Sequence, residues 1–289
     1  MSRFRTVSAF ATCCVLLSLS WIFIKIGVRD FPPLLFASVR CLLSAGFLFA
    51  YARIMGIPMR LRYVTHRVNF LGGLLFFGIP FVTIFIGEKT VDASIAAVVF
   101  SCGPVFSVTM ARIFLKERLT PYRIAAILLG LSGIFYLYLP ALLSAGFRAN
   151  MGLFLILVGA LAGAGGVIVV KKYLHHEDPS VALPHQMVMV APVIFIASLL
   201  MESYKQMTIT PAFLVSLLYL ALLSSGVAYV LFFWMLKHVD ISQIVYIDFI
   251  DPVLSIIFAS LLLGEAVSAR LAVSTALIVA GGFLATRGA

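Results

Sequence analysis

The sequence has very little charge. Only 11% of its 289 residues are Asp, Glu, Lys or Arg, whereas 63% are hydrophobic, and the mean hydropathy is +1.14. A soluble domain is about 45–50% apolar and about 25% charged. The composition therefore excludes a soluble globular protein and indicates a chain that crosses a membrane many times.

Long polar connections are also lacking. Apolar runs follow one another with short links, and each is long enough for the helix of about 20 residues that crosses a bilayer. They are apolar all round, unlike the alternating strands of a membrane barrel. Ten are predicted, at 7–27, 34–55, 69–87, 93–115, 122–140, 151–170, 183–201, 211–235, 242–263 and 269–286. The first run has no convincing cleavage site, so it is interpreted as a span. The predicted fold class is an all-α polytopic membrane protein with ten transmembrane helices.

The residue patterns of several chemistries are missing. The chain has four cysteines and no Cys-x-x-Cys pair, and its five histidines offer no two pairs at metal-ligand spacing. We find neither a P-loop nor a nucleophile with a neighbouring base. We therefore expect no metal, no cofactor, no enzymatic activity and no direct use of ATP. The cysteines are interpreted as small apolar packing residues.

Acidic residues are scarce, 11 against 21 Lys and Arg, which gives a formal net charge of +10. With the N-terminus in the cytoplasm, fourteen cations fall on the cytoplasmic side and six on the other, and Arg40 lies inside a span. The positive-inside rule then predicts that both termini are cytoplasmic. The surplus charge is expected to orient the chain and to contact anionic lipid headgroups. The predicted partners are a bilayer and a small molecule, and no nucleic acid.

What the sequence does contain is a repeat. The stretch "EKTVDAS" at 88–94 returns as "LKHVDIS" at 236–242, a shift of 148 positions. With the same shift, eighteen of the sixty-two pairs between 74–135 and 222–283 are identical, which indicates a duplicated segment. The identical pairs include Gly78/Gly226, Phe85/Phe233, Pro104/Pro252 and Glu117/Glu265.

Each copy holds five spans, so the first copy is predicted to cover residues 1–147 and the second 148–289. Because five is odd, the second copy should enter the membrane upside down. The charges support this, since "RIFLKERLTPYR" is rich in Lys and Arg, whereas its counterpart "SLLLGEAVSARL" keeps the glutamate and only Arg270 as a cation. Inverted repeats are typical of secondary transporters with two alternating states.

The arrangement resembles the EamA branch of the drug/metabolite transporter (DMT) superfamily. The resemblance rests on five plus five helices, a proline in the fourth helix of each copy, the turns "LKERLT" and "LLGEAVS" that follow, and glycine-rich fifth helices. Length and aromatic content are similar to the YddG-type amino acid exporters of this branch. The resemblance implies an exporter of small metabolites, above all neutral or aromatic amino acids, in a bacterial inner membrane, as a monomer or homodimer. The alternative is a drug, multidrug or other metabolite exporter of the superfamily.

Function is expected where the two copies differ. In the ninth span, Asp248 and Asp251 are three residues apart and share one helix face, and their counterparts are Phe100 and Gly103. Each charge within a span costs about 2.5–3.5 kcal/mol, so both should face a cavity or a partner. Arg40 in the second span is the candidate partner of Asp251. Three roles stay open: an ion pair that joins the second and ninth spans, proton coupling, and contact with a zwitterionic substrate.

Aromatic residues and two prolines complete the predicted substrate pathway. A mostly apolar pocket with a few polar anchors suits a small organic metabolite. The aromatic candidates are Trp21, Phe81, Tyr229, Trp234 and Tyr246. Pro104 and Pro252 lie in the middle of spans four and nine, where each removes one backbone hydrogen bond. They are interpreted either as helix breaks beside the pathway or as packing kinks.

Polar residues at the span ends are interpreted as structural. Asp92 and Asp240 are expected at the N-caps of spans four and nine. Glu117 and Glu265 are expected to accept hydrogen bonds from exposed amides or to pair with a cation. Glycines such as Gly133 and Gly281 permit close contact between helices, either within one chain or between two.

Overall fold

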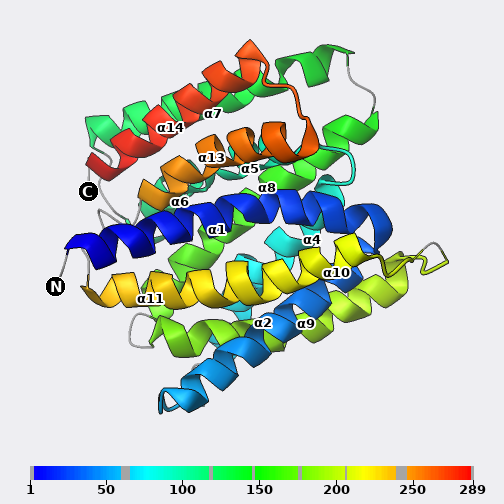
Figure 1. Ribbon diagram of the computed structural model, residues 1–289. Helices are drawn as coiled ribbons and strands as arrows, with labels where there is room; N and C mark the ends of the chain where they lie inside the picture. The colour runs from blue at the N-terminus through cyan, green and yellow to red at the C-terminus, as the bar shows by residue number, and fades with distance from the viewer. Residues whose placement is uncertain are drawn as a thin grey trace.

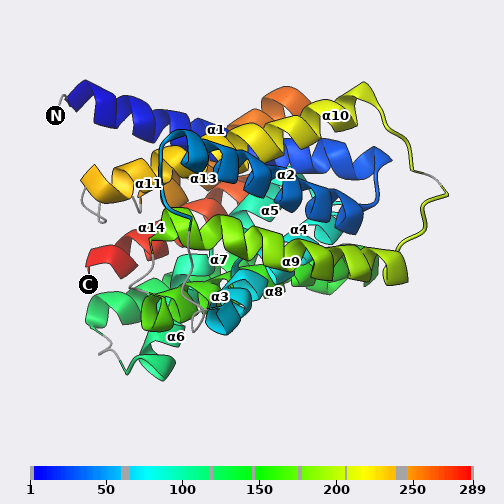
Figure 2. The same cartoon turned by 90° about the horizontal axis from the view of Figure 1, so that it is seen from below.

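The computed structural model describes residues 3–59, 66–116, 120–144, 147–174, 178–205, 207–238 and 246–287, and all regular secondary structure in these ranges is helical. Both termini lie at one end of the molecule, and the link between α9 and α10 lies at the other (Figure 1). Figure 2 shows the same long helices running between these two ends.

The first half of the chain forms five helical segments. They are α1 (Arg3–Asp30), α2 (Pro33–Ile54), α3 with η2 and α4 (His66–Gly73, Leu74–Gly78, Ile79–Gly87), α5 with α6 (Ala93–Phe100, Gly103–Phe114), and α7 (Pro121–Ser144). The second half repeats this series. Its segments are α8 (Phe147–Tyr173), α9 (Pro179–Met201), α10 with η3 and α11 (Pro211–Leu218, Tyr219–Val227, Ala228–His238), α13 (Tyr246–Leu263) and α14 (Ala269–Arg287).

Helix starts follow the local sequence. Asp178 caps α9 by accepting a hydrogen bond from the Ser180 amide, and Thr210 caps α10 through the Phe213 amide. In both helices proline occupies the first turn, where its missing N–H costs nothing. The sequence therefore encodes these boundaries directly.

Seven of the helices among the described residues are long and apolar enough to cross a membrane, and the stretches Ile124–Leu137 and Ala269–Leu284 are shorter apolar helices. The remaining segment, α13, carries Asp248 and Asp251 within its 18 residues. Each of the ten predicted spans thus corresponds to a helical segment, as expected for a polytopic membrane protein.

The third segment of each half contains a π-helical stretch. These stretches are η2 (Leu74–Gly78) and η3 (Tyr219–Val227), and the repeat shift of 148 places residues 74–78 on 222–226. A π-helical turn inserts extra backbone into a helix and is frequent at functional sites. The same irregularity therefore occurs at equivalent positions of the two copies.

Helix packing follows the same pattern. α4, in the third segment of the first half, packs along α8, the first segment of the second half. The equivalent contact joins α1, the first segment of the first half, to η3 and α11 in the third segment of the second half. α1 also packs on α13, and α8 packs on α5 and α6. The pairs α2 with α9, α5 with α13 and α7 with α14 each join equivalent segments. Every one of these contacts is therefore matched by its counterpart in the other half.

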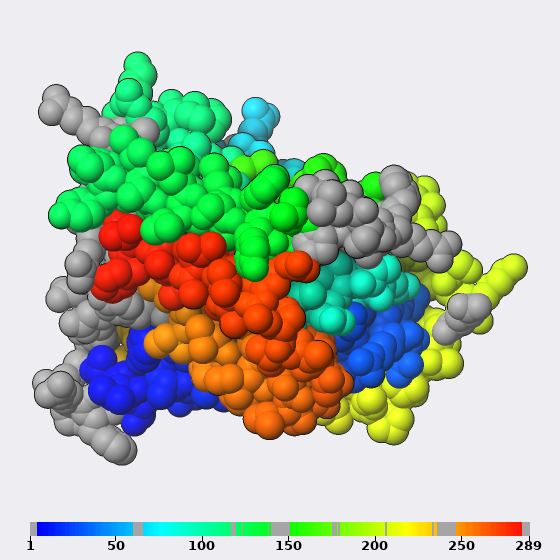
Figure 3. All heavy atoms as spheres, turned by 90° about the horizontal axis from the view of Figure 1, so that it is seen from above, coloured from blue at the N-terminus to red at the C-terminus, as the bar shows by residue number. Residues whose placement is uncertain are grey.

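The close contact between α7 and α14 is built on glycine. A Cβ atom at Gly281 would lie 2.9 Å from the Ala126 carbonyl oxygen, and one at Gly133 would lie 3.0 Å from the Ser274 carbonyl oxygen. Only a residue without a side chain allows the two backbones to approach so closely. These two predicted glycine contacts therefore lie within one chain. Figure 3 shows α14 (red) beside α13 (orange) on this face of the molecule.

Candidate functional site

Arg40 is a buried cation in the middle of the bundle. It lies in α2 and is only 5% exposed. Its Nε and Nη2 atoms donate to the Ser225 hydroxyl in η3 at 3.3 and 3.1 Å. The guanidinium carbon also lies 4.4 Å from the centre of the Phe81 ring and 5.7 Å from that of Phe85. These aromatic faces attract the cation but carry no negative charge.

Asp251 binds a different group from the one predicted. Its Oδ2 atom accepts a hydrogen bond from Trp21 Nε1 at 3.0 Å, whereas Oδ1 is buried without a partner among the described residues. The ion pair between Arg40 and Asp251, one of the three roles left open by the sequence, is therefore not formed. Arg40 is directed to Ser225 in η3, while Asp251 faces α1. Similar depth in the bilayer did not bring the two charges together, because the two helices turn these side chains toward different neighbours.

Asp248 is exposed on the inner face of α13. Helix geometry places Asp248, Asp251 and Ser255 on one side, since they are spaced three and four residues apart. The Ser255 hydroxyl donates to the Ser18 carbonyl of α1, so this side faces the bundle. Val253 and Ile257, which are 43% and 46% exposed, lie on the opposite side. Asp248 is therefore accessible from within the bundle rather than from the lipid-facing side.

The predicted aromatic residues are distributed over two clusters. Trp21 and Phe81 belong to the main core, with Tyr229 packed against it, and Trp21 stands 5.5 Å from the Phe100 ring. Tyr229 is 6.2 Å from Phe77 between ring centres. Trp234 packs instead against a second cluster, formed by α1, α11 and α13. The side chain of Tyr246 lies outside the described residues, so its predicted role stays a prediction.

The two matched prolines have different effects on their helices. The fourth segment is interrupted at Ser101 and Cys102, and Pro104 lies in the first turn of α6. α13, in contrast, continues through Pro252 from Tyr246 to Leu263. The expected break at Pro252 is therefore corrected to a proline within a continuous helix. Gly103 has open space beside it, whereas the equivalent Asp251 is held by Trp21.

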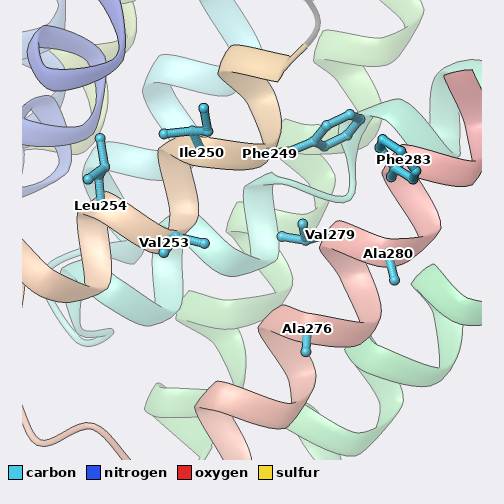
Figure 4. A pocket seen from close by; sticks show the side chains of 8 residues that line it. All are labelled: Phe249, Ile250, Val253, Leu254, Ala276, Val279, Ala280 and Phe283. Carbon is cyan, nitrogen blue, oxygen red and sulfur yellow. The ribbon is translucent and has the colours of Figure 1, made fainter. Parts of the chain in front are cut away.

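An apolar groove of about 580 Å³ lies between α13 and α14. It is lined by Phe249, Ile250, Val253, Leu254, Ala276, Val279, Ala280 and Phe283 (Figure 4). None of the predicted pathway residues lines it. With no polar side chain in its wall, this groove offers nothing that would bind a charged metabolite.

The end of the bundle remote from the termini is tied together by polar contacts. We call it the closed end, and it comprises residues 31–32, 88–92, 202–205, 207–210 and 264–268. Lys25 Nζ in α1 donates to the carbonyl oxygens of Glu88 and Val91 at 2.7 and 2.5 Å. Thr210 donates to Asp30 Oδ2 at 2.7 Å, and the Thr208 amide donates to the Asp30 carbonyl at 3.0 Å.

Two glutamates cap helices of the opposite half of the chain. Glu265 accepts hydrogen bonds from the amides of Ala93 and Ser94 at 2.8 and 3.0 Å, and also from the Ser94 hydroxyl. Glu265 therefore accepts amide hydrogen bonds as predicted. Asp92 occupies the N-cap position of α5, but its side chain makes no capping bond. Its counterpart Asp240 and the other predicted acceptor, Glu117, lie outside the described residues.

Glu202 caps α2 in the same manner. Its carboxylate accepts from the amides of Leu34 and Leu35 at 2.8 and 3.0 Å, and from the Ser198 hydroxyl at 2.6 Å. Pro33 at the start of α2 leaves these amides as the first free donors. Glu202 was not predicted, although a glutamate between two spans was the available signal.

Glu88 was also missed, and its environment is unusual. It is fully buried, and neither carboxyl oxygen has a hydrogen-bond partner among the described residues. Glu88 directly follows the third segment, and the equivalent position of the second copy is Leu236. A glutamate that appears in only one copy was the signal that could have identified it.

Known proteins support the transporter interpretation. The profile of the EamA-like transporter family matches residues 5–139 and again residues 150–287. The chain is 26% identical over 268 residues to the uncharacterized transporter YoaV of Bacillus subtilis, covering 92% of this chain and 91% of YoaV. It is 28% identical over 287 residues to a probable amino-acid metabolite efflux pump of Salmonella typhimurium, covering 93% and 91%.

One further relative adds to the transporter interpretation, and one solved structure shares the fold. The uncharacterized inner membrane transporter YedA of Escherichia coli is 28% identical over 250 residues, covering 85% of this chain and 78% of YedA. A solved crystal structure superposes with a TM-score of 0.68 at 21% identity, covering 99% of this chain and 98% of the other. That likeness concerns the fold alone.

Proposed function

Because the chain belongs to the EamA-like transporter family, we propose that it is a secondary transporter that exports small zwitterionic metabolites, above all neutral or aromatic amino acids. It would act by alternating access in a bacterial inner membrane, with both termini in the cytoplasm. Two relatives are named probable amino-acid metabolite efflux pumps, and another is named an inner membrane transporter. These names support the substrate class and the location.

The observation that carries the proposal is the uncompensated charge at the centre of the bundle. Arg40 donates to one neutral hydroxyl, and no carboxylate lies within ion-pair distance among the described residues. An ionisable group inside a membrane is costly and generally marks a functional site. A guanidinium is well shaped to bind a carboxylate with two parallel hydrogen bonds. Arg40 would therefore bind the carboxylate of the substrate.

The accessible Asp248 would bind the ammonium group at the other end of the substrate. It lies on the inner face of α13, and α13 and α2 both pack against α1. An ammonium group would be attracted to its carboxylate, whereas a side chain of the substrate would pack against the rings of Trp21, Phe81 and Tyr229. A few charged anchors among apolar walls are typical of sites for small metabolites. Asp251, held by Trp21, would fix one wall of the site.

Alternating access would follow from two inverted copies, residues 1–147 and 148–289. The two profile matches, the equivalent π-helical stretches and the paired helix contacts support this division. With five spans in each copy, the second copy begins at the opposite side of the membrane. Inverted repeats of this kind supply two states that mirror one another.

Efflux from proteoliposomes tests the proposed function. Vesicles that contain purified protein are loaded with one radiolabelled amino acid at a time, and with a cationic drug as the alternative cargo. We expect saturable efflux of neutral or aromatic amino acids, inhibited by an unlabelled amino acid but not by its amide, which lacks the carboxylate. Efflux of the drug alone would favour the multidrug alternative and overturn the proposal.

A further inference from the structure

Glu88 combines complete burial with the lack of any hydrogen-bond donor. Its side chain is 0% exposed, and both carboxyl oxygens are unpartnered among the described residues. Burying an ionised carboxylate without a counter-charge or donors is so costly that such a group takes up a proton instead. In this conformation Glu88 is therefore expected to be a neutral acid.

Lys25, the cation that acts most strongly on Glu88, makes its hydrogen bonds to other atoms. Lys25 Nζ binds the carbonyl oxygens of Glu88 and Val91 rather than the Glu88 carboxyl group. These bonds fasten α1 to the turn between α4 and α5. The turn also holds the N-terminus of α5, which Glu265 caps from the second half of the chain. Glu88 is therefore buried in the same turn that Lys25 and Glu265 join to the rest of the closed end.

We propose that Glu88 is a proton-binding site and that the closed end forms only when this site holds a proton. Opening the end would separate Glu265 and Lys25 from the turn and admit water to Glu88, which would then release its proton. The inference rests on the proposed alternating access, and it makes the proton the second ligand of the cycle. A proton bound from the outside would favour the return of the empty transporter.

The charged groups around Glu88 agree with this direction. Burial raises the pKa of Glu88 well above its ordinary range, and Lys25 of α1 opposes the rise. The Glu265 carboxylate raises it further, while Arg40 of α2 lowers it. Asp92, on the same turn, is more exposed than Glu88, but its pKa is also raised by partial burial and by Glu265, and Lys25 opposes this rise. Because the acid is weaker in the closed state, closing takes up a proton and is favoured as the pH falls.

The direction and the size of the pH dependence follow from the linkage between proton binding and closing. Between the pKa of Glu88 in the open state and its higher pKa in the closed state, the ratio of closed to open molecules changes by up to about tenfold for each pH unit. Rising pH therefore opens the end, and falling pH closes it. Below both pKa values the dependence disappears.

Accessibility of a buried cysteine tests the proposal without any substrate. Val91 is 4% exposed, so Val91→Cys, made after the four native cysteines are replaced by alanine, should react with an impermeant maleimide only when the end opens. The rate is measured from about pH 5.5 to 7.5 and divided by that of Ala266→Cys, which lies exposed on the same end. This ratio removes the pH dependence of the thiol itself.

We expect the normalised rate to rise about tenfold or more across this range. Glu88→Gln should give a low rate that does not change with pH, and Glu88→Asp should keep a pH dependence. Asp92→Asn removes the other carboxyl of the turn whose pKa is raised, and it should keep the parent profile if Glu88 is the titrating group. Glu88→Leu provides a second neutral side chain if the glutamine variant does not accumulate. A flat parent profile, or a neutral variant with the parent profile, would overturn the proposal. Failure of amino acid efflux with these profiles intact would instead reject only the substrate assignment.

Discussion

Charged side chains at the closed end and at the centre of the bundle have opposite surroundings. Glu265 and Glu202 at the closed end each accept three hydrogen bonds. At the centre, Arg40 donates only to Ser225, and one oxygen of Asp251 has no donor among the described residues. Satisfied charges join helices, whereas unsatisfied ones leave binding capacity for a ligand. Glu88 is the exception, because it is unsatisfied although it lies at the closed end.

The largest effect should come from Arg40→Gln. If Arg40 binds the substrate carboxylate, its loss should lower kcat/KM for efflux about 100-fold, because hydrogen bonds to charged groups contribute about 1.5–3 kcal/mol. Folding yield should stay near normal, since the hydrogen bonds lost are those to the neutral Ser225 hydroxyl. Arg270→Gln, which changes an exposed arginine beside Tyr136, serves as the matched control. A large loss of yield with unchanged kinetics would make Arg40 a structural residue.

Glu265→Ala should instead reduce stability. It leaves the amides of Ala93 and Ser94 without their acceptor, at a cost of about 1–3 kcal/mol. The midpoint of thermal unfolding in detergent should fall, while KM should change little because Glu265 lies away from the central charges. Val267→Thr, at an exposed neighbouring position, should leave the midpoint unchanged. An unchanged midpoint in Glu265→Ala would contradict the structural role of the closed end.

Asp248→Asn should raise KM for a neutral amino acid about tenfold, equivalent to about 1.4 kcal/mol. The amide keeps the size of the side chain but loses the charge that attracts an ammonium group. For an analogue without the amino group, the same variant should transport as well as the parent protein. Equal losses for both compounds would show that Asp248 does not recognise the ammonium group.

The smallest change is expected for Trp21→Phe. It removes the donor to Asp251 Oδ2 but keeps an aromatic ring against Phe100. We expect a loss of about threefold in kcat/KM, because one hydrogen bond has a net value of about 0.5–1.5 kcal/mol. Tyr219→Phe, which removes a hydroxyl from a bond to the Leu16 carbonyl, is the control on the other side of α1. An effect as large as that of Arg40→Gln would show that the indole N–H does more than hold Asp251.

The helical segments could be predicted from the sequence because apolar length alone defines a span. Arg40 and Asp248 could be singled out for a related reason, since a charge within such a run is conspicuous. The partner of Arg40 could not be predicted. Counting residues gives the depth of a side chain in the bilayer but not the rotation of its helix, and α2 turns Arg40 toward Ser225.

The closed end was predictable only in part. Glu265 was expected to accept hydrogen bonds from amides, but the sequence does not reveal that the donors lie in α5 of the other half, 172 positions away. Glu88 stands in a polar turn that looks exposed in the sequence, and its burial depends on distant parts of the chain such as α1, whose Lys25 binds this turn. The break before Pro104 and the continuous α13 show a similar limit. Matched prolines remove the same backbone bond, but the surrounding contacts decide whether the helix separates.

The most direct test of alternating access is the distance across the closed end. Spin labels at Lys89 and Ala266, both exposed, report whether the α4–α5 turn and the α13–α14 link separate. Pulsed electron paramagnetic resonance in proteoliposomes would measure the distance between the two labels at low pH without substrate and at high pH with excess amino acid. We expect one short distance in the first condition and an additional, longer distance in the second. A single unchanged distance in both conditions would contradict it.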